Sequence, residues 1–385
     1  MEFYQNNRPG RSKQAMVSCF LAALFLLCST LFVKLVAGAK LFVSPGASGS
    51  TCTRADPCAL QDALDLAENN SAADTIYLAP GTYAGNFEYR PPDSESYSLE
   101  ITGVSGTTAE DVILDGQNKG RVLGLFYYPY YSVPAFDVCI KGITIENGDS
   151  TLESHRNGGG ISIGVFDANV FITSCIIKNN TAEEEGGGIW VNPTRAFYLE
   201  NNLVVDNIVN ESFAHISRGA GAFLMIPGGF NNVIRNNVFA RNTALGSSSE
   251  GGGLFMGWSG TCTQHVFGNT IYNNHAYDGG GIYFYNASTA NVYNNNYSTM
   301  HGTWTESGNN QDIDPKLRDP ESNDFHLQMN SPMIDAGTDT VPDPPGLPAT
   351  DFEGNTRAFG AAPDIGADER LCVLAPSLDL LLLGN

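Results

Sequence analysis

A glycine-rich triplet recurs five times in the middle of the chain, and it restricts the fold more than any other feature. The triplets start at residues 158, 186, 219, 251 and 279, at intervals of 28, 33, 32 and 28 residues. Each of the first four is followed, about twenty residues later, by an asparagine. A repeat of about 20 to 50 residues is typical of solenoids, in which each repeat adds one unit to a stack. The chain is therefore predicted to form one elongated domain.

Four six-residue segments within the repeats align without a gap. They span 175–180, 202–207, 237–242 and 269–274, and each ends in Asn with an apolar residue three positions before it. Stacked strands lie about 4.8 Å apart, so amides at equivalent turns can donate and accept along the stack. We expect two asparagine columns: one of Asn147, Asn180, Asn207, Asn242 and Asn274, and one of Asn202, Asn237 and Asn269.

The remaining pattern is rich in short strands. From Thr75 onward, apolar runs of three or four residues alternate with turn residues, as at 76–78, 112–114 and 138–140. Such strands can form a β-sandwich or a parallel β-helix, and the regular Gly and Asn columns favour the parallel β-helix. The Gly triplets are expected where φ is positive or where neighbouring coils pack too closely for a Cβ atom.

One short amphipathic helix is predicted near the N-terminus. Asp56 and Pro57 predict its start, and the apolar residues of segment 58–67 recur at helical spacing. The first coil of a solenoid exposes an apolar end and unpaired strand edges. We therefore expect the helix to cover that end, within an N-terminal cap and first coils spanning 40–120.

The N-terminus is predicted to direct export. Basic residues precede an apolar run, and Ala37-Gly38-Ala39 fits a signal-peptidase site, so residues 1–39 are interpreted as a signal peptide. An uncleaved membrane anchor is the alternative. Without these residues the chain has 16 basic and 40 acidic residues, a net charge of −24, which argues against nucleic acid as a partner. A secreted or cell-surface monomer is expected.

The cysteines and the C-terminal segments complete this division of the chain. Cys52 and Cys58 close a short loop and are expected to form a disulfide in an oxidising compartment. Pairing of Cys139, Cys175, Cys262 and Cys372 stays open. The repeat core is predicted over 121–310, an irregular C-terminal cap that folds over the last coil over 311–370, and an apolar tail over 371–385.

Three stretches resemble known families. Segments 41–45, 58–64 and 76–83 resemble the N-terminal edge of secreted β-helix proteins with a pectate-lyase-like fold. The Gly-Gly-Gly-Ile and Ile-x-x-Asn pairs are similar to the repeats of polymorphic outer membrane proteins. Segments 331–337 and 364–369 resemble the closing part of choice-of-anchor Q proteins. This resemblance implies an all-β, right-handed parallel β-helix on an exported protein, usually without assigned chemistry.

Candidate catalytic residues come from charged positions beside the asparagine columns. Asp206 and Arg241 are expected on adjacent coils, with Lys178 and His275 near them in register. A polysaccharide lyase needs a basic residue near carboxylate-bound Ca²⁺, and a glycoside hydrolase needs paired carboxylates. A stacked surface ion pair explains the same residues without catalysis.

Ligand contacts are expected from residues that interrupt the repeat. Tyr127, Tyr128, Tyr130 and Tyr131 belong to the densest aromatic run, interpreted as a loop whose rings either stack on sugars or pack on the flank of the β-helix.

Acidic turns before several Gly triplets are either solvated or bind Ca²⁺, and no metal-ligand motif is present. We therefore predict an exported β-helix protein that binds carbohydrate or another surface. The alternative is a polysaccharide lyase or glycoside hydrolase.

Overall fold

The computed structural model of the chain describes most of the residues from Gly38 to Arg370, and these belong to one compact unit. The described ranges are 38–92, 97–127, 135–165, 167–192, 195–210, 216–225, 231–257, 263–285, 289–302, 304, 306–341, 346–357 and 360–370. Predictions for the tail, for Cys262, Cys372, Tyr128, Tyr130 and Tyr131, and for all but the last two residues of the signal peptide lie outside them.

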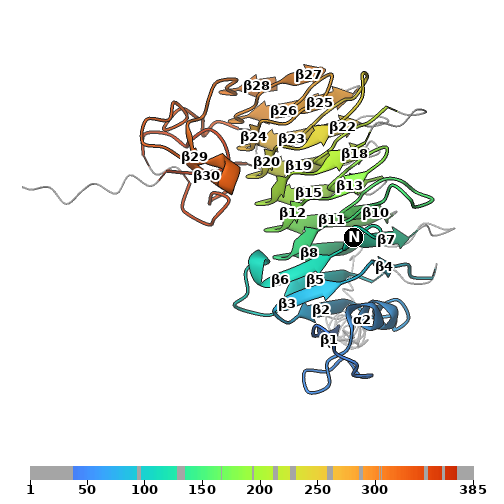
Figure 1. The fold of residues 1–385 in the computed structure, drawn as a ribbon. Helices are drawn as coiled ribbons and strands as arrows, with labels where there is room; N and C mark the ends of the chain where they lie inside the picture. Colours follow the sequence, from blue (N-terminus) through green and yellow to red (C-terminus); the bar gives the residue numbers. More distant parts are fainter. Residues whose placement is uncertain are drawn as a thin grey trace, which may run out of the picture. The chain divides into compact units, whose positions relative to one another are not determined.

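Three long sheets form the body of the molecule, and within each of them neighbouring strands run parallel (Figure 1). The ten-stranded sheet contains, in order, β1 (Ala39–Val43), β2 (Asp74–Leu78), β5 (Leu99–Gly103), β8 (Phe136–Lys141), β11 (Ala168–Thr173), β15 (Phe197–Glu200), β19 (Asn231–Arg235), β23 (Thr263–Phe267), β26 (Thr289–Tyr293) and β28 (Glu306–Gly308).

The eight-stranded sheet contains β4 (Phe87–Tyr89), β7 (Leu123–Tyr127), β10 (Ile161–Val165), β14 (Ile189–Val191), β18 (Ala222–Met225), β22 (Leu254–Gly257), β25 (Ile282–Tyr285) and β27 (Met300–Gly302). The seven-stranded sheet contains β3 (Gly81–Ala84), β6 (Val112–Asp115), β9 (Thr144–Glu146), β12 (Ile176–Lys178), β16 (Leu203–Val205), β20 (Val238–Ala240) and β24 (Thr270–Tyr272). A small sheet adds β13 (Thr181–Ala182), β17 (Ile208–Val209) and β21 (Thr243–Ala244).

Each coil visits the eight-, ten- and seven-stranded sheets in turn before the chain returns to the eight-stranded sheet one layer further on. The protein is thus a right-handed parallel β-helix, as the sequence predicted. Its core is built from inward-facing columns, such as the one formed by Ile177, Val204, Phe239 and Ile271, each of which is at most 1% exposed. Burying one such side chain contributes about 1.5 to 3 kcal/mol.

The two predicted asparagine columns form hydrogen-bonded ladders inside the turns. In the first, the Asn207 backbone N–H and Nδ2 both donate to Asn242 Oδ1, at 3.1 and 2.9 Å, while Nδ2 also donates to the Ile177 carbonyl. In the second, Asn237 makes the same pair of bonds to Asn269 Oδ1 and a third to the Leu199 carbonyl. All these asparagines are fully buried, so the ladders satisfy backbone groups that water cannot reach.

The ladders differ from the prediction at their ends. Asn147 was wrongly placed in the first column: Glu146 pairs with Lys178, so Gly148 occupies the position of Asn180 and donates its N–H to Asn180 Oδ1. The second ladder continues beyond Asn269 through Asn295 to Asn310. Shorter final coils carry these two residues, which is why the earlier spacing did not reveal them.

The Gly triplets combine both expected constraints. The first glycine of a triplet has positive φ, as at Gly186 with φ +64°. The third packs against the next coil: a Cβ atom on Gly188 would lie 2.6 Å from the Gly221 carbonyl oxygen. No side chain fits there without moving the backbone, because backbone hydrogen bonds between parallel strands hold the two coils together.

Helix α2 (Leu60–Ala67) lies at the first coil, against β1, β2 and β4 (Figure 1). Its buried residues are Leu60, Ala63, Leu64 and Ala67, the face that the spacing predicted. The predicted start was too early. The N-cap is Ala59, while Asp56 accepts hydrogen bonds from Thr51 and Ser50 in the preceding loop. Cys52 and Cys58 form a disulfide across this loop, and Cys139 and Cys175 are free thiols.

The C-terminal cap contains the antiparallel strands β29 (Leu317–Asp319) and β30 (Asp324–Leu327), joined by the 3-10 turn η2 (Pro320–Ser322). A second 3-10 turn, η1 (Ala109–Asp111), precedes β6.

The cap meets the last coils through Asn296 and Asn309, which donate to the Ile313 and Ala336 carbonyls, but its apolar residues do not lie over the last coil, where the prediction placed the cap. Its apolar residues Phe325, Leu327 and Met333 pack on Val205 and Ala240, on the outer face of the seven-stranded sheet, so the cap lies along the flank of the β-helix (Figure 1). Small apolar side chains on that outer face provide the surface on which it packs.

Candidate functional site

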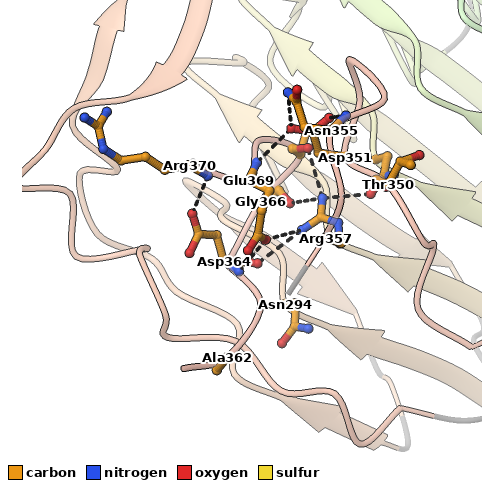
Figure 2. A network of polar contacts seen from close by, with 12 residues as sticks. Asn294, Thr350, Asp351, Asn355, Arg357, Ala362, Asp364, Gly366, Glu369 and Arg370 are labelled. Carbon is orange, nitrogen blue, oxygen red and sulfur yellow. Dashed lines mark hydrogen bonds and ion pairs between the residues drawn. The ribbon is translucent and has the colours of Figure 1, made fainter. Parts of the chain in front are cut away.

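The largest cluster of buried charges lies in the cap, around Arg357 (Figure 2). Arg357 Nη2 donates to the carbonyls of Gly366 and Ala367 and to Asn236 Oδ1, all within 2.9 Å, and Nη1 lies 3.9 Å from Glu369 Oε2. Asn236 belongs to the turn between β19 and β20. Arg357 therefore ties the cap to the side of the β-helix.

The acids around Arg357 accept hydrogen bonds from backbone N–H groups. Asp364 accepts from Asp335 and Arg370, Asp368 from Leu327, and Glu369 from Asp364. Burial raises the pKa of Asp364 to about 6, against the hydrogen bonds that it accepts, and burial also raises the pKa of Asp368. Their carboxylate oxygens are bonded to backbone groups of the chain itself, so we interpret the cluster as structural.

Asp206 and Arg241 lie on adjacent coils and form a bidentate ion pair, with Nε–Oδ1 at 2.8 Å and Nη2–Oδ2 at 2.7 Å. Arg241 also donates to the Pro320 carbonyl and to Asn323 Oδ1 of the cap. Its backbone has φ +55°, a conformation that costs an arginine about 1 kcal/mol. The pair therefore holds the cap in place, and the guanidinium beside Asp206 is already bound to its carboxylate.

Lys178 and His275 do not join this pair. Lys178 Nζ lies 3.1 Å from Glu146 Oε2, on the coil before it. His275 is exposed and lines a cavity at the far end of the β-helix. Of the four predicted catalytic candidates, the structure brings together only Asp206 and Arg241.

Tyr127 is not a surface contact. It is the last residue of β7, only 1% of it is exposed, and its ring packs edge-on against Phe136 at 5.6 Å. The interpretation of 126–131 as a loop was therefore wrong for its first two residues, which continue the strand. A buried ring cannot stack on a sugar.

Two adjoining cavities lie beside the last coils, with volumes of about 360 and 460 Å³. They share the lining residues Asn273 and Ser298. We call them together the terminal groove, lined by residues 271–280, 296–301 and 312–315. The Ser298 hydroxyl oxygen is buried and has no hydrogen-bond partner in the described part of the chain.

Aromatic rings and acids line both cavities of this groove. Tyr272, Tyr297 and Asp312 line the smaller cavity, and Tyr277 and Asp278 line the larger one. Tyr277 is 75% exposed, so its ring is accessible to a ligand. Burial, together with the nearby Asp312 carboxylate, raises the pKa of Tyr297.

One wall of the groove carries a close acid–imidazole pair. His301 Nδ1 lies 2.6 Å from Asp278 Oδ1, and both side chains are partly exposed. The His301 ring stacks on Tyr283, with ring centroids 5.0 Å apart. Partial burial raises the pKa of Tyr283, and the nearby carboxylates of Glu250 and Asp278 raise it further.

A stripe of stacked rings leads from the groove along the outer face of the eight-stranded sheet. Phe223, Phe255, Tyr283 and His301 occupy one register and stack in sequence.

A parallel column of charges, formed by Glu185, Arg218, Glu250 and Asp278, runs just before the Gly triplets. Arg218 donates to Glu250 at 2.9 Å and to Glu185 at 3.4 Å, so two carboxylates share its charge. The sequence revealed an acid before most triplets but not this pairing.

The described residues contain no group of three or more His, Cys, Asp or Glu arranged to hold a metal ion. Within the same ranges, no helix has the length and hydrophobicity needed to cross a lipid bilayer.

Comparisons with known proteins agree with the fold. A family model described as a right-handed β-helix region matches residues 132–297. Among curated protein sequences, none matches the chain.

Two solved structures are similar in fold. Pectate lyase Pel9A has a TM-score of 0.40 at 14% identity, covering 87% of this chain and 97% of its own. Pectin methylesterase from carrot has a TM-score of 0.34 at 12% identity, covering 71% and 88%. The class of protein that the sheet topology and the family model define is a right-handed parallel β-helix, and the two likenesses do not bear on its activity.

Proposed function

We propose that this chain is an exported or cell-surface β-helix protein that binds carbohydrate in the terminal groove, with no catalysis assigned to it. The observation that carries the proposal is the groove itself: two adjoining cavities of about 360 and 460 Å³, lined by tyrosines and by short polar side chains. Aromatic faces with a few placed polar groups are what a sugar ring requires from a binding site.

The predicted surface location rests on the N-terminal sequence and on the cysteines. Segment 1–39 has the pattern of a signal peptide, and the disulfide between Cys52 and Cys58 suits an oxidising compartment. The net charge of −24 without that segment argues against nucleic acid as a partner. A polysaccharide or a cell-surface glycan is the partner that fits these features.

The proposal is tested by calorimetric titration of the purified chain with neutral, acidic and amino oligosaccharides, with and without Ca²⁺. We expect at least one class to bind, and Tyr277→Ala to weaken that binding about tenfold, equivalent to about 1.4 kcal/mol. Tyr97→Ala is the matched control. Tyr97 is 40% exposed, lies just before β5 in the first coils, and does not line the groove. Absence of binding by every class would overturn the proposal.

Glycan cleavage is a second candidate function, and the Asp278–His301 pair is the observation that favours it. Hydrolysis needs an acid to protonate the leaving oxygen and a base to activate water. Glu250 lies one coil from Asp278 and supplies a second carboxylate. Incubation of each bound glycan with the chain should then release new reducing ends, or unsaturated ends if the reaction is elimination. Asp278→Asn should abolish them, and intact glycan after prolonged incubation would contradict this candidate.

A further inference from the structure

We infer that the terminal groove selects glycans that carry free amino groups over glycans that carry carboxylates. The inference rests on the proposed carbohydrate binding and goes beyond it, because it names the charge class of the ligand. The terminal groove is lined by three carboxylates, from Asp278, Asp312 and Asp314. None of its described lining residues is a lysine or an arginine.

The acids lie in both cavities. Asp312 and Asp314 line the smaller one and Asp278 the larger, with Asn273 and Ser298 between them. An extended glycan that crossed both cavities would therefore meet a carboxylate at each end. Ammonium groups on such a chain would gain charge-assisted hydrogen bonds, whereas uronate groups would be repelled.

The nearby lysine and arginine side chains do not cancel this acidity. Lys316 pairs with Asp314 at 2.5 Å, yet the Asp314 side chain is 63% exposed and can still accept from a ligand. Arg218, the arginine of the charge column, pairs with both Glu185 and Glu250. His301 contacts only one oxygen of Asp278, whose side chain is 37% exposed.

The tyrosines suit the same ligand. A ring face attracts both the C–H faces of a sugar and a cation placed above it. Tyr277 and Asp278 are consecutive, and Tyr297 is close enough to Asp312 for that carboxylate to raise its pKa. Each cavity thus offers a ring beside an acid, the combination that an amino sugar can use at both its apolar face and its ammonium group.

The test compares tetrasaccharides of glucosamine, N-acetylglucosamine and galacturonate by calorimetric titration at pH 6, with and without Ca²⁺, at low and high salt. We expect the glucosamine tetramer to bind at least tenfold tighter than the acetylated one, and the galacturonate tetramer to bind weakest. Binding of the glucosamine tetramer should weaken with salt, because the contacts are ionic. Asp278→Asn and Asp312→Asn should each weaken it about threefold to fivefold and reduce its salt dependence.

The control separates the groove from the overall acidity of the chain, which attracts any polycation. Glu110 is exposed in η1, within the first coils, and Glu110→Gln removes one charge in the same way. It should leave the affinity unchanged, and an equal loss with this variant would overturn the inference.

Equal affinity for the acetylated tetramer, or tighter binding of galacturonate with or without Ca²⁺, would overturn the inference while leaving carbohydrate binding intact. Binding of none of the three, together with no binding of neutral glycans, would overturn the proposed function and the inference with it.

Discussion

The asparagine ladders and the C-terminal cap solve the same physical problem in different ways. Both must satisfy backbone groups that are shut off from water. In the ladders, identical amides on successive coils do this by making the same three hydrogen bonds at each step, as Asn207 and Asn237 show. In the cap, the buried Arg357 does this with one nitrogen (Figure 2). Its Nη2 donates to three oxygens, those of Asn236, Gly366 and Ala367.

The difference follows from regularity. Coils that superpose bring equivalent amides to hydrogen-bonding distance at every layer. The buried backbone groups are therefore hydrogen-bonded in the same way at each step, and each asparagine contributes a small part of the total. An irregular cap has no equivalent positions, so few groups carry most of its polar contacts. The comparison predicts that single substitutions in the cap cost more than single substitutions in a ladder.

Arg357→Met should have the largest effect. It leaves Glu369 and several carbonyls without their buried partner, and loss of one side of a buried charge network costs about 3 to 5 kcal/mol. Urea unfolding followed by tryptophan fluorescence, together with limited proteolysis of 311–370, measures the loss. Arg318→Met is the control, since Arg318 is exposed on β29. A cost no greater than that of a ladder substitution would show that the cap does not depend on this single guanidinium.

Asn237→Ala should come second. It removes the acceptor of the Asn202 N–H and Nδ2 groups and the donor to the Leu199 carbonyl. Leaving buried polar groups unpaired costs about 1 to 3 kcal/mol. The free energy of unfolding should fall by about 2 to 3 kcal/mol in urea titrations, whereas Asn169→Ala, which removes an exposed bond to Asp137, should change little. An unchanged free energy of unfolding would show that the ladder is dispensable.

The stability of the cap should depend on pH, because it contains buried acids. Burial raises the pKa of Asp364 to about 6 and also raises that of Asp368, so the folded state binds their protons more tightly than the unfolded state. Burial of the His326 ring lowers its pKa, but hydrogen bonds to Glu353 and Asp324 outweigh this effect, and its pKa is raised.

All three contributions stabilise the folded cap at low pH. The contribution of Asp364 is lost as pH rises from about 4 to about 6, and the contributions of Asp368 and His326 are lost as pH rises through their raised pKa values. The free energy of unfolding should therefore fall by about 2 kcal/mol between pH 4 and pH 8, the order of magnitude that the shift of Asp364 implies. Asp364→Asn should flatten the part of the curve below pH 6. A rise in stability over this range would contradict the assignment.

Arg241→Ala should have the smallest effect. It breaks the ion pair with Asp206 and the bonds to Pro320 and Asn323, but the pair is partly exposed and alanine keeps the same strained backbone. We expect a loss of about 1 kcal/mol, with faster proteolysis at the cap. Lys178→Ala, which breaks a comparable pair with Glu146, is the control. Equal proteolysis of the two variants would show that Arg241 does not hold the cap.

Much of the repeat core could be predicted because its spacing is visible in the chain. The gapless segments placed Asn207 beside Asn242 and Asn237 beside Asn269, and the structure confirms both columns. The error at Asn147 was a displacement of one residue, which only the pairing of Glu146 with Lys178 reveals. Periodicity shows that a column exists, but strand register decides which residue enters it.

The terminal groove could not be predicted in the same way. Its walls come from three stretches, 271–280, 296–301 and 312–315, and no spacing links them. His275 was singled out for its nearness to Arg241 in register, yet the structure assigns it to the groove. Tyr127 was chosen because its aromatic run interrupts the repeat and exposed tyrosine rings can stack on sugars, but it is buried because β7 extends through it.

The amino-acid sequence alone predicts the parallel β-helix, the short helix at its start and the two ladders, because stacked coils repeat their chemistry at intervals that can be counted. The three-dimensional structure was needed to show that the cap lies along the flank, that Arg241 holds it there, and that tyrosines and acids line a groove at the last coils. Those contacts join segments that are far apart in the chain and are not related by the repeat, so they leave no periodic trace in the sequence.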